Sequence, residues 1–188
     1  AGVNLSQGAN SNTIVGNYIG VGADGSTPLS NGIGVLVYGA ANNTIGGTTA
    51  AARNVISGNS STNITLQTLN ASHQTINNVI QGNYIGPDAS GLGIVSPGAL
   101  YGIYVVGGAA NNRISGNVIA GNFDGVYIDV SAAVGSGSSQ NCFNGNTRYG
   151  VYNTNSGTIA PLGGNWWGSL TGPTYSGNPG GTGDAISA

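Results

Sequence analysis

The sequence predicts an all-β fold: a right-handed, single-stranded parallel β-helix of about five to six coils, each with three short strands. Three observations support this expectation. Several phrases recur at long intervals, apolar residues come in short runs separated by glycine and asparagine, and the residues that most favour helices are nearly absent.

The composition excludes a helical fold. Lys, Glu and Met are missing from the 188 residues, whereas 36 glycines and many Asn and Thr residues favour turns and strands. The hydrophobic fraction of 39% is enough to fill one continuous core. We therefore expect a single β-helix domain over residues 1–188, with coils from about residue 12 to 168 and a Gly/Pro-rich tail over 169–188.

Two repeat periods are visible in the chain. The phrase GNYIG occurs at 16–20 and again at 82–86, and GAANN occurs at 39–43 and at 108–112. A shorter unit with three apolar positions lies inside this long period. The first position is assigned to Ile14, Ile45, Ile80, Ile114 and Phe143. The second is assigned to Ile19, Ile56, Ile85 and Ile119. The third is assigned to the pairs Val35/Val37, Ile64/Leu66, Ile103/Val105 and Val126/Ile128, and to Val151.

Stacking explains this pattern better than hairpins do, because the apolar runs are very short and corners of Gly and Asn separate them. Stacked coils would place Ile and Val ladders inside and Asn ladders at the corners. Insertions are expected where loops can project without disturbing the ladders, at residues 21–30, 47–53, 87–100 and 131–140.

The two ends of the coil stack are predicted to differ. The first eleven residues show no amphipathic pattern, so we expect the first coil to lack a cap. Near the other end, Trp166 and Trp167 precede the Gly/Pro-rich segment and could fold over the last coil as an end cap or stacking pair. Alternation would place one of the two rings in the core and the other outside.

The charge pattern excludes some partners. Charged residues make up 4% of the chain, lysine is absent, and the net charge is −2, so no basic stripe could neutralise nucleic-acid phosphates. No apolar run is long enough to cross a bilayer, so no membrane insertion is expected. The start of the sequence predicts a mature secreted segment with its signal peptide removed. Cys142 is the single cysteine, so an internal disulfide is excluded.

Few residues could carry chemistry. Asp124 and Asp129 form a weak alternative polar site, but their odd separation predicts side chains on opposite faces of a strand, with Asp124 at a corner. Asp24 and Asp88 fall in equivalent insertions, expected about 14 Å apart from the coil spacing. His73 is predicted to lie exposed in a loop. The sequence therefore predicts no catalytic set, no metal site and no cofactor.

An aromatic file is the most informative surface feature. If the third apolar positions point inward, alternation sends Tyr104, Tyr127 and Tyr152 outward on successive coils, with Leu36 and Thr65 continuing the file. These rings could simply stabilise the sheet by cross-strand packing. Alternatively, they form a binding or assembly face for sugar rings or another protein.

Several phrases carry a resemblance to a known group. The segments GNYIGVGADG, NNTIGG and RNVISGN, and Asn165-Trp166-Trp167-Gly168 followed by Gly172-Pro173, resemble those of bacterial right-handed parallel β-helix repeat proteins of the pectate-lyase-like superfold. The resemblance runs from about Asn12 to Pro173. It implies the β-helix fold, and it leaves function open because that superfold hosts lyases, hydrolases, adhesins and tailspikes.

These observations lead to two functional hypotheses. The first is a non-catalytic extracellular structural or cell-surface module, acting in adhesion or self-assembling end to end into filaments. The alternative is a polysaccharide-binding or polysaccharide-degrading β-helix protein of the lyase or hydrolase kind. The predicted partners are accordingly a second copy of the chain or an extracellular polysaccharide.

Overall fold

The fold was determined from a computed structural model, which describes residues 1–96, 98–155 and 163–187. Residues 97, 156–162 and 188, which belong to the predicted coils and tail, lie outside the described residues.

The described chain winds through three sheets, and every pairing between named strands is parallel. One passage through sheets A, B and C is called a coil. Sheet A consists of β1 (Val3–Ser6), β4 (Ile33–Tyr38), β7 (Thr62–Gln67), β10 (Tyr101–Val106), β13 (Asp124–Ile128) and β15 (Tyr149–Asn153). Sheet B consists of β2 (Thr13–Ile14), β5 (Thr44–Gly46), β8 (Val79–Gln81) and β11 (Arg113–Ser115). Sheet C consists of β3 (Tyr18–Ile19), β6 (Val55–Ile56), β9 (Tyr84–Ile85), β12 (Val118–Ala120) and β14 (Cys142–Asn144).

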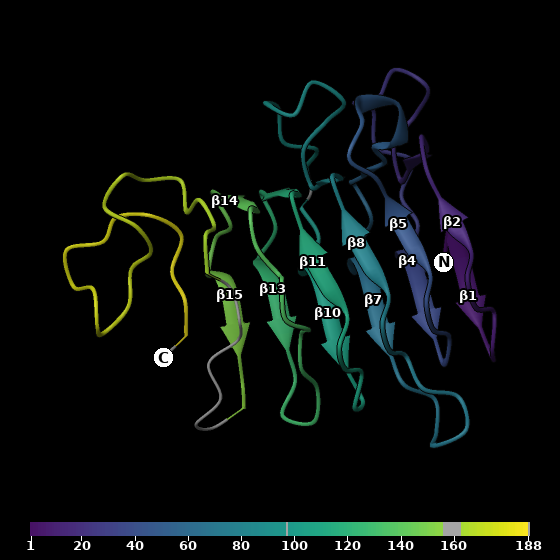
Figure 1. Cartoon of the computed structure of the whole chain (residues 1–188). Helices are drawn as coiled ribbons and strands as arrows, with labels where there is room; N and C mark the ends of the chain where they lie inside the picture. Colours follow the sequence, from purple (N-terminus) through teal and green to yellow (C-terminus); the bar gives the residue numbers. More distant parts are fainter. Residues whose placement is uncertain (97, 156–162, 188) are drawn as a thin grey trace.

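Strands of each sheet follow one another in chain order, so the coils stack from the N-terminal end to the C-terminal end (Figure 1). The helical content of the described residues is a single 3₁₀ turn, Ala50–Ala52, inside a predicted insertion. The prediction of an all-β parallel β-helix is therefore confirmed.

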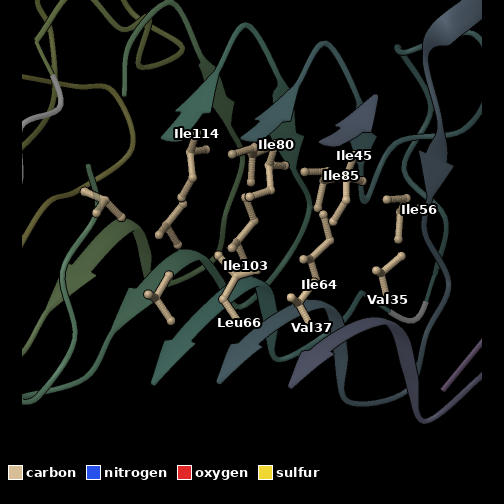
Figure 2. Close-up of a cluster of buried hydrophobic side chains, with 14 of the residues drawn as sticks. Val35, Val37, Ile45, Ile56, Ile64, Leu66, Ile80, Ile85, Ile103 and Ile114 are labelled. Atoms are coloured by element: carbon tan, nitrogen blue, oxygen red, sulfur yellow. The ribbon is translucent and has the colours of Figure 1, made fainter. Parts of the chain in front are cut away.

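The core consists of like residues stacked over like. Ile45 pairs with Ile80 in sheet B, and Ile56 pairs with Ile85 in sheet C. In sheet A, Ile64 pairs with Ile103. Figure 2 shows these side chains meeting in the space that the three sheets enclose. Most of these side chains have no exposed surface. Burying a side chain of this size stabilises the fold by about 1.5–3 kcal/mol.

One ladder assignment was wrong. Phe143 does not follow Ile114 in sheet B; it pairs with Ile119 and extends the sheet C ladder. The predicted insertion at 131–140 replaces the sheet B strand of that coil, and Val134 forms only an isolated bridge with Asn112. The Ser138 hydroxyl accepts the Ile114 backbone N–H at 3.1 Å and so takes the place of a strand carbonyl.

The first coil begins earlier than residue 12. β1 pairs with β4 in full register, from Val3 with Val35 to Ser6 with Tyr38. Val3 and Leu5 alternate with polar residues and pack against the core while half-buried. The first eleven residues thus supply the first strand of sheet A, and Val3 and Leu5 are its two inward apolar positions.

Asparagine ladders occupy the corners between sheets. At the corner between sheets B and C, the backbone N–H and Nδ2 of Asn83 both donate to Asn117 Oδ1, at 3.0 Å each. The second Nδ2 hydrogen of Asn83 reaches back to the carbonyl of Ile45 on the previous coil at 2.9 Å. The same arrangement recurs between Asn117 and Asn141. Each asparagine thereby binds the coils on both sides of its own.

A second ladder runs along the corner between sheets C and A, and its side-chain-to-side-chain bonds run toward the C-terminal end, while Asn122 and Asn146 also donate back to the carbonyls of Ile85 and Ile119. Asn122 donates to Asn146 Oδ1, and Asn146 donates to Asp184 Oδ2 at 2.7 Å. Asp184 also accepts the backbone N–H groups of Gly145 and Asn146. A carboxylate accepts and cannot donate, so Asp184 is a chemically suitable last member of this ladder.

Residues 163–187 cover the last coil (Figure 1, yellow). Trp167 is buried and stacks on Phe143, with ring centroids 4.7 Å apart and planes within 15°. Trp166 is 45% exposed. Further along, Gly150 donates its backbone N–H to Ala185, and Ser187 donates to Val151. The segment therefore satisfies the outer edge of β15 and covers the core with an indole ring.

The Asn117 ladder position should be essential for stability. Asn117→Ala leaves buried donors of Asn83 without an acceptor, and we expect the free energy of unfolding to fall by about 3 kcal/mol. The matched control is Asn144→Ala, an exposed asparagine on β14, for which we expect a change within about 0.5 kcal/mol. Urea unfolding followed by circular dichroism measures both. Equal unfolding midpoints for the two variants would contradict the role assigned to the ladder.

Candidate binding face

The outer surface of sheet A carries a file of tyrosines. Strand register places Leu36, Thr65, Tyr104, Tyr127 and Tyr152 on successive strands, each beside the next. The ring centroids of Tyr104 and Tyr127 are 5.3 Å apart, and those of Tyr127 and Tyr152 are 5.2 Å apart. Both ring pairs meet edge to face, the geometry that aromatic quadrupoles favour.

Two further tyrosines join this file. The Tyr101 ring lies 4.9 Å from Tyr104 and 4.8 Å from Tyr127, and the Tyr149 ring stacks on Tyr152 at 4.9 Å. Our sequence reasoning missed both. The signal was available, because Tyr101-Gly102-Ile103-Tyr104 and Tyr149-Gly150-Val151-Tyr152 differ only in Ile against Val. We call Tyr101, Tyr104, Tyr127, Tyr149 and Tyr152 together the tyrosine face.

A glycine corner explains why residues three apart share one face. A side chain at Gly125 would point into the interior, 3.1 Å from the Phe143 ring and 2.5 Å from the Gly150 carbonyl. Val126, the next residue, is fully buried in the core. Two consecutive residues thus face inward, and strict alternation is broken at the start of β13. The residues on either side, Asp124 and Tyr127, consequently both face outward.

The prediction that Asp124 and Asp129 point to opposite faces was therefore wrong. Asp124 pairs in register with Tyr101 and Tyr149. Its carboxylate accepts two hydrogen bonds from Arg148, with Nε at 2.8 Å from Oδ1 and Nη2 bonded to Oδ2. The Asp124 side chain is fully buried in this pair, whereas the Arg148 side chain is 35% exposed.

Arg148 lies between this ion pair and the rings. Its guanidinium carbon is 4.4 Å from the centre of the Tyr152 ring and 4.7 Å from that of Phe123. Cations over aromatic faces are attracted by the ring quadrupole. The hydrogen bond to Asp124 raises the pKa of Arg148. Arg148 thus holds Asp124, Phe123 and the tyrosine face together as one cluster.

Asp129 adds a negative charge next to two of the tyrosines. Burial, followed by the negative charge of Asp129, raises the pKa of Tyr104. Burial, Tyr101 and Asp129 raise the pKa of Tyr127 in the same direction. Both phenols are consequently neutral at physiological pH and can donate their hydroxyl protons.

All five rings of the tyrosine face are half-buried. Among the described residues, none of their five hydroxyls has a hydrogen-bond partner, and none is a buried unsatisfied group. By contrast, the hydroxyl of Tyr84 on sheet C accepts a bond from Arg53 at 3.1 Å. The tyrosine face therefore presents unpaired hydroxyls to solvent.

The remaining candidates from the sequence lie elsewhere. Asp24 accepts the backbone N–H groups of Ser26 and Thr27 and the Thr27 hydroxyl, and Asp88 binds Ser90 in a similar turn. Hydrogen bonds led by these hydroxyls lower the pKa of both carboxyls. The two loops are in contact: the backbone N–H of Ala89 donates to the carbonyl of Gly25 at 2.9 Å. The coil that lies between them has only a short turn at this position.

His73 was predicted to be exposed, and this was wrong. It is half-buried because its turn packs against Gly39, where an added Cβ would be 2.8 Å from that of His73. It lines a hollow of about 180 Å³, and its Nδ1 atom is buried without a partner among the described residues. None of the described residues that line this hollow is acidic.

In the described part of the chain, no three His, Cys, Asp or Glu side chains lie close enough together to hold a metal ion. The same part of the chain contains no helix long and apolar enough to cross a membrane.

The fold and this face define a parallel β-helix with an aromatic outer surface on one sheet. Residues 26–170 match a family described as protein of unknown function (DUF1565), and the chain belongs to that family. The family is associated with parallel β-helix proteins, in agreement with the three sheets. No curated protein and no solved structure matched the chain.

The ion pair gives a stability prediction. Arg148→Ala leaves the Asp124 carboxylate buried without a partner, and we expect the free energy of unfolding to fall by about 3–5 kcal/mol. The double variant Asp124→Asn/Arg148→Met removes both charges and should recover a large part of that loss. Thermal unfolding followed by circular dichroism compares the two variants. A double variant no more stable than Arg148→Ala would contradict a penalty that arises from the unpaired charge.

The tyrosine pKa shifts predict a pH dependence. The folded state favours the neutral phenols of Tyr104 and Tyr127, so these shifts leave stability unchanged below about pH 10 and lower it as the pH rises further. In a pH titration followed by tyrosinate absorbance, the step at the highest pH belongs to Tyr104 and Tyr127. Asp129→Asn should move this step to lower pH, because one of the charges that oppose ionisation is removed. Asp24→Asn, which removes the same charge from a distant loop, should leave that step in place. Identical titration curves for Asp129→Asn and the parent chain would argue against the coupling.

Proposed function

We propose that this chain is an extracellular surface module that acts in adhesion, with a structural rather than a catalytic role. The observation that carries the proposal is the tyrosine face, where five half-buried rings present unpaired hydroxyls on one sheet. A stack of coils is a suitable support, because each strand is held by its neighbours and its outer side chains stay in register.

The local packing favours a face that is already organised before it binds. Arg148 fixes Tyr152 from one side and Tyr149 stacks beside it. Side chains held in this way lose little conformational entropy on binding, so more of the contact energy becomes affinity. A polysaccharide is the partner that we propose, since aromatic rings and hydroxyls match the apolar faces and hydroxyls of sugars.

The finer relationship is also a proposal. The phrases GNYIG and NWWG support kinship with the bacterial pectate-lyase-like superfold, and the parallel β-helix agrees with it. Degradation of polysaccharide has less support than binding, because Asp124 is committed to Arg148. End-to-end filaments also have less support than contact through sheet A, because residues 163–187 cover the last coil.

A triple variant tests the proposal. Tyr104→Ser, Tyr127→Ser and Tyr152→Ser together should abolish retention of the chain on insoluble polysaccharide and on polysaccharide-coated cells, because the rings that make the contact are gone. Tyr18→Ser is the matched control, since Tyr18 is an outward and 47% exposed tyrosine of sheet C. Circular dichroism checks that each variant is folded.

The outcomes separate clearly. If the folded triple variant is retained as well as the parent chain, the tyrosine face is not the adhesive surface. Fibres of the parent chain in electron micrographs, unaffected by the triple variant, would favour end-to-end assembly instead.

A further inference from the structure

The charges around the tyrosine face indicate which class of polysaccharide it can accept. The chain has three arginines and no lysine. Arg53 donates to the Gly82 carbonyl and to the hydroxyl of Tyr84 on sheet C, and Arg113 donates to Gln81 on sheet B. Neither is part of sheet A. Arg148 is therefore the one arginine at the tyrosine face.

The charge of Arg148 is already compensated. Both oxygens of the buried Asp124 carboxylate accept bonds from the guanidinium, and the rings of Phe123 and Tyr152 flank it. A carboxylate on a ligand would have to compete with Asp124 for the same donors. Displacing Asp124 would leave that carboxylate buried and unpaired, which is strongly unfavourable.

A second carboxylate leaves the face with an excess of negative charge. Asp129 follows Tyr127 by two residues and donates its backbone N–H to the carbonyl of Val105, the residue after Tyr104, at 3.0 Å. Its negative charge opposes the ionisation of both phenols. With Asp124 and Arg148 cancelling each other, Asp129 gives the surroundings of these rings a net negative charge at neutral pH. The whole chain has a net charge of −2, which adds to the repulsion of polyanions.

The polar groups that the tyrosine face itself offers are neutral phenol hydroxyls. The five hydroxyls can each donate and accept, and the rings supply apolar area beside them. The Tyr104, Tyr127 and Tyr152 rings follow one another along the coil axis at 5.3 and 5.2 Å. A long ligand can therefore contact all three rings only by lying along that axis.

We propose that the tyrosine face binds a neutral polysaccharide along the β-helix axis and discriminates against polyuronates. This inference rests on the proposed function, because it assigns a ligand class to the same surface.

Affinity electrophoresis in native gels tests the inference on the full chain. The neutral probes are hydroxyethyl cellulose, galactomannan and dextran, and the acidic probe is polygalacturonate. We expect at least one neutral polymer to retard the chain, whereas polygalacturonate does not. The triple Tyr→Ser variant should weaken retardation by about tenfold or more in apparent Kd.

Two further variants test separately the contribution of the tyrosine hydroxyls and that of the Asp129 charge. Replacing Tyr104, Tyr127 and Tyr152 by Phe retains the rings and their packing, and it should weaken neutral binding because the hydroxyls are lost. Asp129→Asn should leave neutral binding unchanged and allow weak retardation by polygalacturonate at low salt. Tyr18→Ser should behave as the parent chain does.

The results that overturn this inference differ from those that overturn the proposed function. Retardation by polygalacturonate as strong as by the best neutral polymer, or retardation by none of the neutral polymers, rejects the ligand class. The adhesive surface itself is rejected by the earlier retention assay, when the folded triple Tyr→Ser variant adheres as the parent chain does.

Discussion

The structure depends on satisfying backbone groups at the corners of the coils. A chain that turns after two or three strand residues leaves buried N–H and C=O groups at every turn, and each unpaired group is costly. Asparagine solves this problem because its side chain resembles a peptide group, with one acceptor oxygen and two donor hydrogens. The side chains of Asn83 and Asn117 donate to both neighbouring coils and accept from the asparagine of the coil before. The isoleucine ladders can fill the interior only because these corners hold the three sheets in place.

This arrangement also explains which features could be predicted from the sequence. The ladders of Ile45 and Ile80 and of Ile56 and Ile85 follow from the repeated phrase, because a repeat places like residues over like. Phe143 could not be assigned correctly by the same rule. The segment before it lacks a sheet B strand, and the Ser138 hydroxyl replaces the missing carbonyl. Such a substitution of side chain for backbone leaves no periodic signal in the sequence.

The candidate face was predictable in part for a similar reason. Alternation along a strand is enough to bring Tyr104, Tyr127 and Tyr152 into one file. It fails at the inward-facing glycines Gly102, Gly125 and Gly150. This failure hid the positions of the preceding residues, Tyr101, Asp124 and Tyr149. The partner of Asp124 was hidden as well, since Arg148 belongs to the following coil, 24 residues further along the chain. Contacts of this kind become visible only when the length of each coil is known.

The direction of the asparagine bonds has an electrostatic consequence. The side-chain oxygens of Asn122 and Asn146 accept bonds from Asn63 and Asn122, and each of the two amides donates one Nδ2–H toward the C-terminal end. The same Nδ2 groups also reach back to the carbonyls of Ile85 and Ile119. The column therefore behaves as a row of aligned dipoles, much as the peptide groups of an α-helix do. Its positive end lies at the last coil, where the carboxylate of Asp184 is placed as an anion is placed at a helix N-terminus. The β-helix thus carries an axial polarity that its nearly uncharged composition does not reveal.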